Sequence, residues 1–195
     1  MSISTRTGVN ISSGPIQEFR KELTVRPITN NEFGFPPPPF KVFKSTKTGI
    51  CVPRFYAEQR IGKPVEDKRP EPARIKIKFQ GQLRASTRQV EAFDRAIEAG
   101  HGVLSLPCGY GKTTVALAIA CKLRYRTMII VHKQFLADQW RERIKQFVPG
   151  ATVGVIQQEK LEVECDFVIA MLQSLSLKEY NFSDFESFGT VIVDE

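Results

Sequence analysis

Apolar and polar residues follow clear periods from about residue 74 onward. Residues 75–79 (IKIKF) place an apolar side chain at every second position, which predicts a half-buried strand. A helical period follows and predicts a helix that begins after Thr87, as its capping residue, and ends at Gly100. The apolar face of this predicted helix consists of Val90, Phe93 and Ile97.

Buried strands and helices are then predicted in alternation up to the last residue. The expected strands are apolar runs at 102–106, 127–131, 151–156, 166–171 and 189–195. The expected helices span 111–123 and 134–147, and we interpret Trp140 as a core residue because it lies on the apolar stripe of the second. Continuous apolar runs fit strands covered on both faces, and the alternation predicts an α/β fold with a doubly wound parallel sheet.

The first 73 residues follow a different pattern, with little helical periodicity and many prolines. The segment FPPPPF (35–40) predicts an extended polyproline rod. The segments LTVRP, KVFK and ICVPRFY predict short strands or extended chain, and the polar run at 63–73 predicts a linker. We therefore expect a small, Pro-rich, mostly β or extended N-terminal region at 1–73 and an α/β domain at 74–195.

Charge is distributed unevenly between these regions. Residues 1–80 contain 15 Lys and Arg against 7 Asp and Glu, whereas residues 81–195 contain 13 against 14. A basic segment of this kind attracts polyanions, most commonly nucleic acid, independently of their sequence. A solvated basic tail without a partner is the alternative that composition leaves open.

The remaining composition excludes several classes of protein. The four cysteines form no C-x-x-C pair and have no histidine nearby, which argues against a zinc site and a secreted disulfide framework. No apolar run is long enough to span a membrane, and the N-terminus has no secretory signal. We expect an intracellular protein, in the nucleus, the cytoplasm or a virion.

The segment LPCGYGKTT (106–114) stands between a predicted buried strand and a predicted helix, the context of a phosphate-binding loop. Gly109 and Gly111 would let backbone N–H groups and the helix N-terminus surround an anion. Lys112 would contact the β- and γ-phosphates of ATP, and the Thr113 hydroxyl would hold Mg²⁺. The usual pattern, G-x-x-x-x-G-K-S/T, has glycine where this chain has Leu106.

A second part of such a site is predicted at the end of the last strand, in VIVDE (191–195). Asp194 would hold the metal ion, and Glu195 would act with Lys112 in catalysis by orienting the attacking water. Because a strand with two catalytic carboxylates is an unusual place for a protein to end, we expect the chain to be a fragment of a longer protein.

Five blocks in order make residues 82–195 resemble the first RecA-like domain of superfamily 2 helicases, especially the group with XPB and large DNA virus helicases. They are TRQVEA (87–92), the loop at 106–113, IIVHKQFLADQW (129–140), AMLQSL (170–175) and VIVDE (191–195). In this superfamily the loop often lacks the leading glycine and reads Leu-Pro-Cys-Gly or Leu-Pro-Thr-Gly. The resemblance implies a RecA-like P-loop NTPase fold for 74–195, as a truncated first helicase domain.

The resemblance also implies roles for individual residues. Gln89 would contact adenine, whereas Lys133, Gln173 and Ser174 would contact a nucleic-acid strand. ATP would be bound by the whole loop: Leu106, Pro107, Cys108, Gly109, Tyr110, Gly111, Lys112, Thr113 and Thr114. The alternatives without a binding role are surface positions for Gln89 and Lys133 and a simple turn at 173–174.

The implied function is an ATP-hydrolysing helicase or translocase whose partner is nucleic acid, DNA rather than RNA, with no membrane. The family's second RecA-like domain, which supplies an arginine to the ATPase site, is missing, so the isolated chain is expected to be weakly active or inactive. A P-loop ATPase with another role and a fragment that binds nucleotide and nucleic acid without turnover remain as alternatives.

Overall fold

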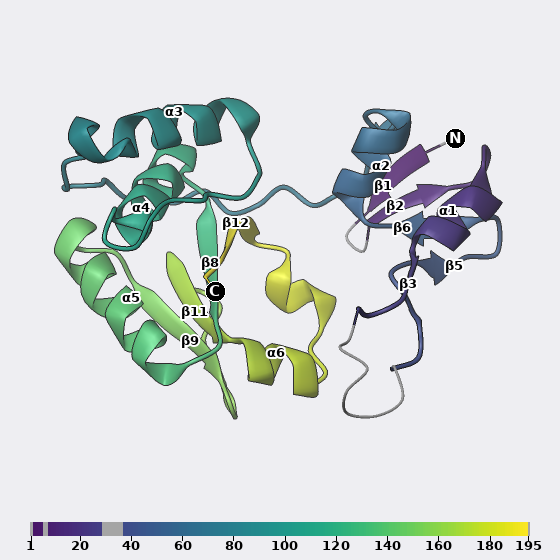
Figure 1. Ribbon diagram of the computed structural model, residues 1–195. Coiled ribbons are helices and arrows are strands. Elements are labelled where there is room, and N and C mark those ends of the chain that lie inside the picture. Colours follow the sequence, from purple (N-terminus) through teal and green to yellow (C-terminus); the bar gives the residue numbers. More distant parts are fainter. Residues whose placement is uncertain (1, 6–7, 29–36, 195) are drawn as a thin grey trace. The chain divides into compact units, whose positions relative to one another are not determined.

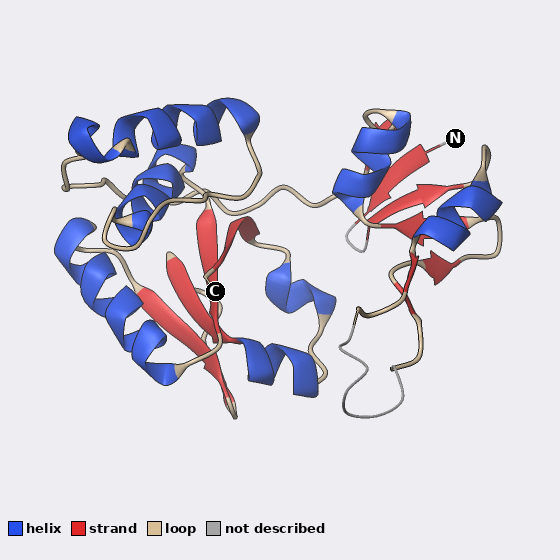
Figure 2. Cartoon of the chain, viewed as in Figure 1, coloured by secondary structure: helices blue, strands red, loops and turns tan. Residues whose placement is uncertain are grey.

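The computed structural model describes residues 2–5, 8–28 and 37–194, and the chain divides into two compact units, Met1–Pro70 and Glu71–Glu195 (Figure 1). Each unit has its own sheet and its own apolar core (Figure 2). Among the described residues, no helix combines the length and the apolar character that crossing a bilayer requires.

The N-terminal unit is built on a sheet with the strand order β5-β6-β2-β1-β7. Its strands are β1 (Ser2–Thr5), β2 (Gly8–Ile11), β5 (Lys44–Ser45), β6 (Ile50–Val52) and β7 (Glu66–Asp67). A separate short ladder joins β3 (Thr24–Val25) to β4 (Phe40–Lys41). The helices α1 (Ile16–Glu22) and α2 (Arg54–Ile61) contribute Phe19 and Ala57 to the buried core.

Strands predominate in this unit as expected, but the helix α2 corrects the expectation of an extended chain at ICVPRFY. In ICVPRFY the strand ends at Val52, and α2 begins directly after Pro53. Proline suits a helix start because its fixed φ is compatible with the first turn and its missing N–H is not needed there. The Arg54 Nε to Glu58 Oε1 ion pair of 2.7 Å then links successive turns. Of the predicted polyproline rod, Phe35 and Pro36 lie outside the described residues.

The C-terminal unit contains a five-stranded sheet in the order β10-β9-β11-β8-β12. The strands are β8 (Arg126–Val131), β9 (Val153–Gln157), β10 (Lys160–Leu161), β11 (Phe167–Met171) and β12 (Phe188–Val193). Strands β9, β11, β8 and β12 run parallel, and the short β10 pairs antiparallel with β9. This parallel α/β sheet confirms the predicted fold class.

Helices cover both faces of the sheet (Figure 1). On one face, α4 (Lys112–Leu123) and α5 (Gln134–Phe147) bury Leu117, Trp140 and Ile144 against Ile129 of β8. On the other face lie α6 (Leu172–Leu177) and the 3-10 helix η3 (Phe182–Phe185). Burial on both sides accounts for the continuous apolar runs of β8 and β11, whereas the edge strand β12 leaves Val191 and Val193 exposed.

Two predicted strands do not form. Residues 75–79 alternate as expected, with Ile75 buried, but they form no ladder with any described strand. The preceding residue, Arg74, makes an isolated bridge to Tyr125. Residues 102–106 pair with no described strand, and Val103 stays 96% exposed. In both segments the apolar pattern predicted buried side chains. It did not show which strand would form backbone hydrogen bonds with the segment.

The predicted cap at Thr87 is also wrong. A 3-10 turn, η2 (Ala85–Thr87), precedes α3 (Gln89–Ala99), and Arg88 occupies the capping position with φ of 54°. The Thr87 hydroxyl donates instead to the Arg84 carbonyl oxygen, at 3.3 Å. Gly100 ends the helix in the left-handed conformation, with φ of 72°, as its sequence position predicts.

Candidate nucleotide site and carboxyl-edge surface

A cavity of about 500 Å³ lies at the N-terminus of α4, within the size range of small-molecule sites. Of the predicted nucleotide-binding residues, it brings together Gln89, Pro107, Gly109, Gly111, Lys112, Thr113 and Thr114. Leu106, Cys108 and Tyr110 belong to the same loop but do not line this cavity. Most of the loop's predicted contacts therefore converge on one space.

The loop preceding α4 is shaped to present hydrogen-bond donors. Gly109 and Gly111 have φ values of 79° and 77°, a region that favours glycine. The first i to i−4 hydrogen bond of α4 runs from Val115 N to Gly111 O, at 3.1 Å. The N–H groups of residues 112–114 thus precede the helical ladder and are available to an anion, whose charge the helix dipole favours.

The side chains around the cavity add positive charge. Lys112 lines it together with Arg84 and Arg143, and no Asp or Glu is among its lining residues. Lys112 Nζ donates to the carbonyl oxygen of Leu106, at 3.1 Å. The Leu106 position thus contributes a backbone carbonyl, which any residue supplies, so the missing leading glycine leaves this contact unaffected.

Gln89 is buried, at 4% exposure, so the alternative of a surface position is wrong. Its Oε1 accepts from Arg84 N at 2.8 Å, and its Nε2 donates to Tyr110 O at 2.7 Å. The side chain therefore ties the segment before α3 to the phosphate-binding loop. The adenine contact stays a prediction, because these two backbone groups already engage both ends of the amide.

Gly111 is expected to be far less tolerant of substitution than Gly109. A Cβ at Gly111 would lie 2.5 Å from Gln89 Nε2, whereas a Cβ at Gly109 would meet no atom within 4 Å. Both changes to Ala incur similar left-handed strain, about 1 kcal/mol. Gly111→Ala must also displace a buried, hydrogen-bonded amide, so urea unfolding should show it about 1–3 kcal/mol less stable than Gly109→Ala. Equal stabilities would contradict the bracing role of Gln89.

Asp194 follows β12 and is held in place by two contacts. Its backbone N–H continues the ladder to Ile130 O, at 3.0 Å, and its Oδ2 accepts from Trp140 Nε1 at 2.7 Å. Trp140 is 2% exposed, which confirms its interpretation as a core residue. Asp194 is not among the residues lining the cavity, and Glu195 lies outside the described residues.

The predicted metal ligands have suitable chemistry for Mg²⁺. Thr113 and Asp194 offer hard oxygen donors from the contacting elements α4 and β12. The described residues contain no group of three or more His, Cys, Asp or Glu that could hold a metal by itself. Mg²⁺ is commonly held by only one or two protein ligands together with substrate phosphates and water, so the residues present fit it.

The predicted nucleic-acid contacts meet at the carboxyl edge of the sheet, where β8, β9 and β11 end. Gln173 Nε2 donates to His132 O at 2.8 Å, joining the start of α6 to the residue before Lys133. Ser174 Oγ accepts from Gln158 N at 3.0 Å. Lys133 Nζ lies 5.9 Å from the ring centroid of Phe135, which is 62% exposed. We call Lys133, Phe135, Gln173 and Ser174 the carboxyl-edge surface.

Several residues that line the cavity carried no signal in the sequence. Gln82 and Arg84 come from the segment before α3, and Gln139, Arg143 and Gln146 come from the polar side of α5. Nothing distinguishes these positions locally from an ordinary solvated helix face. The packing of α5 beside α4 makes the three α5 residues part of the site.

In a comparison with known protein families, residues 78–195 match the family described as "Type III restriction enzyme, res subunit". An Acanthamoeba polyphaga mimivirus protein, named as a candidate ATP-dependent RNA helicase, is 36% identical over 95% of this chain and 37% of its own length. A candidate helicase of Invertebrate iridescent virus 6 is 40% identical, over 62% of this chain and 29% of its own length. A third candidate helicase, from Invertebrate iridescent virus 3, is 32% identical over 75% of this chain and 46% of its own length.

Among solved structures, the Sulfolobus solfataricus SWI2/SNF2 ATPase core in complex with dsDNA is similar over 64% of this chain and 27% of its own. The TM-score is 0.46 and the sequence identity is 21%. The chain spans between 29% and 46% of the length of the three viral relatives.

Proposed function

Because the chain belongs to the superfamily 2 helicase family described as the type III restriction enzyme res subunit, we propose that it is the N-terminal, ATP-binding part of a nucleic-acid helicase or translocase. The observation that carries this proposal is the cavity at the start of α4, where helix N–H groups and Lys112 face the same space without any carboxylate. A polyphosphate is the ligand that such a site favours.

In this proposal each predicted residue has one task. The N–H groups of residues 112–114 and the ammonium group of Lys112 bind the phosphates, while Gln89 braces the loop through its hydrogen bond to Tyr110 O. Thr113 and Asp194 would hold Mg²⁺, which would supply charge neutralisation at the phosphates. Trp140 orients Asp194 through its indole N–H, and Glu195 positions the attacking water.

The carboxyl-edge surface is the proposed contact with nucleic acid. Lys133 provides a cation for a phosphate, and the exposed Phe135 ring beside it provides a face for a base. Gln173 and Ser174 fix the neighbouring turn through their hydrogen bonds. We propose DNA as the substrate, and RNA is the competing one because the mimivirus relative is named as an RNA helicase.

A second proposal, binding without multiple turnover, is favoured by the small share of each relative's length that this chain spans. The three viral relatives have more than half of their length outside the matched part. An arginine from a second RecA-like domain would complete the ATPase site, so the chain alone is proposed to bind ATP and nucleic acid without multiple turnover. Sustained hydrolysis by residues 1–195 alone would contradict this reading.

The test is ATP hydrolysis, with DNA or RNA oligonucleotides added, by a protein that extends to the length of the relatives. We expect the rate to rise with nucleic acid. Lys133→Ala should need about fivefold more oligonucleotide for half-maximal stimulation, since one phosphate contact is lost. The matched control is Lys145→Ala, which changes an exposed lysine of α5, the helix that Lys133 directly precedes. A rate indifferent to nucleic acid would favour a P-loop ATPase with another role.

A further inference from the structure

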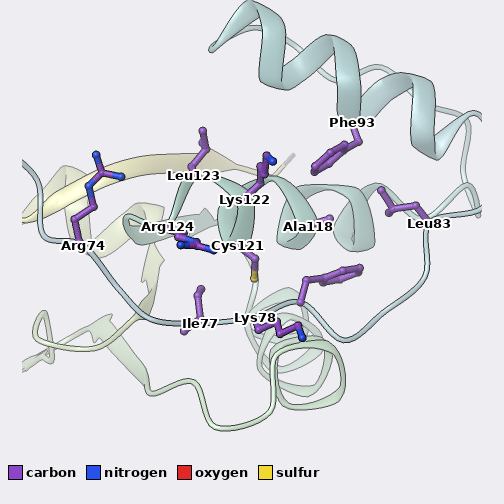
Figure 3. A pocket seen from close by; sticks show the side chains of 11 residues that line it. Arg74, Ile77, Lys78, Leu83, Phe93, Ala118, Cys121, Lys122, Leu123 and Arg124 are labelled. Carbon is purple, nitrogen blue, oxygen red and sulfur yellow. The ribbon is translucent and has the colours of Figure 1, made fainter.

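A second cavity, of about 460 Å³, lies at the opposite end of α4 from the phosphate-binding loop (Figure 3). Its walls come from the extended segment at 74–83, from α3 and from the C-terminal half of α4. The two cavities share no lining residue. The proposed function assigns no role to this second cavity.

Every charged side chain that lines this cavity is basic. They are Arg74, Lys78, Lys122 and Arg124, all four are exposed, and no Asp or Glu is among the lining residues. None of the four forms an ion pair with any residue that the structure describes. Arg74 stacks on the Tyr125 ring, with 4.2 Å from Cζ to the centroid, and keeps its charge available. Four unpaired cations lining one cavity favour an anionic occupant.

The floor of the cavity is apolar. Ile77, Leu83 and Phe93 are half-buried and Ala118 is buried. Figure 3 shows Ile77 among the basic side chains, whereas Leu83 and Phe93 lie together on one side of them. Cys121 completes the floor, and burial raises the pKa of its thiol to about 11, so it is neutral at physiological pH. The floor therefore suits apolar side chains.

We propose that this cavity docks an acidic segment of a partner protein, in which Asp or Glu residues flank one or two large apolar side chains. The carboxylates would pair with the four lining cations, and the apolar side chains would cover Ile77, Leu83 and Phe93. A nucleic-acid backbone would satisfy the cations but would leave the apolar floor exposed to water. An acidic, apolar peptide matches both halves of the cavity.

The test measures fluorescence polarisation of a short labelled peptide, in which Glu alternates with Leu and Phe, against residues 1–195. Binding should weaken about tenfold or more in the Lys78→Glu/Lys122→Glu double variant, because two attractive contacts become repulsive. The matched control is Lys145→Glu/Lys160→Glu, which changes the net charge equally at exposed lysines away from the cavity. Circular dichroism checks that both variants are folded.

Two further arms identify the occupant and the site. A peptide with Ser in place of Leu and Phe should bind at least about tenfold more weakly, because burying even one such side chain contributes roughly 1.5–3 kcal/mol. Equal binding of the Ser peptide, or displacement by an unlabelled oligonucleotide, would show a polyanion site and overturn the proposal. Displacement by excess ATP, or equal losses in the two double variants, would place the peptide elsewhere and would also overturn it.

Discussion

Replacing Lys112 with Ala is expected to weaken ATP binding by about 10- to 100-fold, the loss of one charge-assisted contact worth roughly 1.5–3 kcal/mol. The side chain lines the α4 cavity, and its ammonium group is held by the Leu106 carbonyl at 3.1 Å, ready to meet a phosphate. Removing it leaves the N–H groups at the start of α4 in place, so weak residual binding should remain. Titration with a fluorescent ATP analogue and Mg²⁺ measures the change.

Lys122→Ala is the matched control for this prediction. It removes the same side chain from the same helix, but at the end that faces the second cavity. Its ATP affinity should equal that of the unmodified chain, and both variants should keep their salt-sensitive binding to an oligonucleotide. If Lys112→Ala bound ATP as tightly as Lys122→Ala, the α4 cavity would not be the nucleotide site, and the proposed function would lose its main support.

The sequence predicted well those helices and strands whose burial depends only on the element itself and on the sheet beside it. The bounds of α5 and the core position of Trp140 follow from one apolar stripe, and β8 and β11 follow from runs that are buried on both faces. In these elements every residue's burial is decided by its own helix or strand together with the sheet beside it. Periodicity in the sequence therefore contains the necessary information.

The errors occur where a distant group decides the structure. Residues 75–79 have the alternation of a strand, but Ile75 N donates to Arg124 O and the following Gln80 N donates to Phe147 O, in separate parts of the unit. At the start of α3, the Gln89 side chain bonds to the backbone of Arg84 and of the distant Tyr110. These contacts hold the helix start in place of the predicted Thr87 cap. Periodicity describes which side of a segment is apolar and cannot identify these partners.

The candidate site divides in the same way. The loop at 106–114 was recognisable because its glycines and Lys112 are contiguous and stand directly before a helix. Arg84 and Arg143, which line the same cavity, come from segments about 20 to 30 residues away from the loop and have no local pattern. The contact between Trp140 and Asp194 joins residues 54 positions apart, and an apolar stripe indicates burial but no partner for the indole N–H.

Replacing Trp140 with Ala is expected to destabilise the C-terminal unit by about 3–5 kcal/mol, because it leaves a large cavity in the core. The indole is 2% exposed and packs in the cluster between α5 and the sheet. Since the stability of a domain is roughly 5–15 kcal/mol in total, this loss should be conspicuous in urea unfolding. Trp140 is the sole tryptophan, so circular dichroism has to replace intrinsic fluorescence as the measurement.

Two companion variants separate packing from the hydrogen bond to Asp194. Phe135→Ala removes an aromatic ring from the exposed side of the same helix and should change stability by less than about 0.5 kcal/mol. Trp140→Phe keeps a ring in the core but removes the N–H donor, and should destabilise by an intermediate amount, since a hydrogen bond to a charged group contributes about 1.5–3 kcal/mol. If Trp140→Phe were as stable as the unmodified chain, the indole would not be holding Asp194, and its orienting role in the proposed metal site would be wrong.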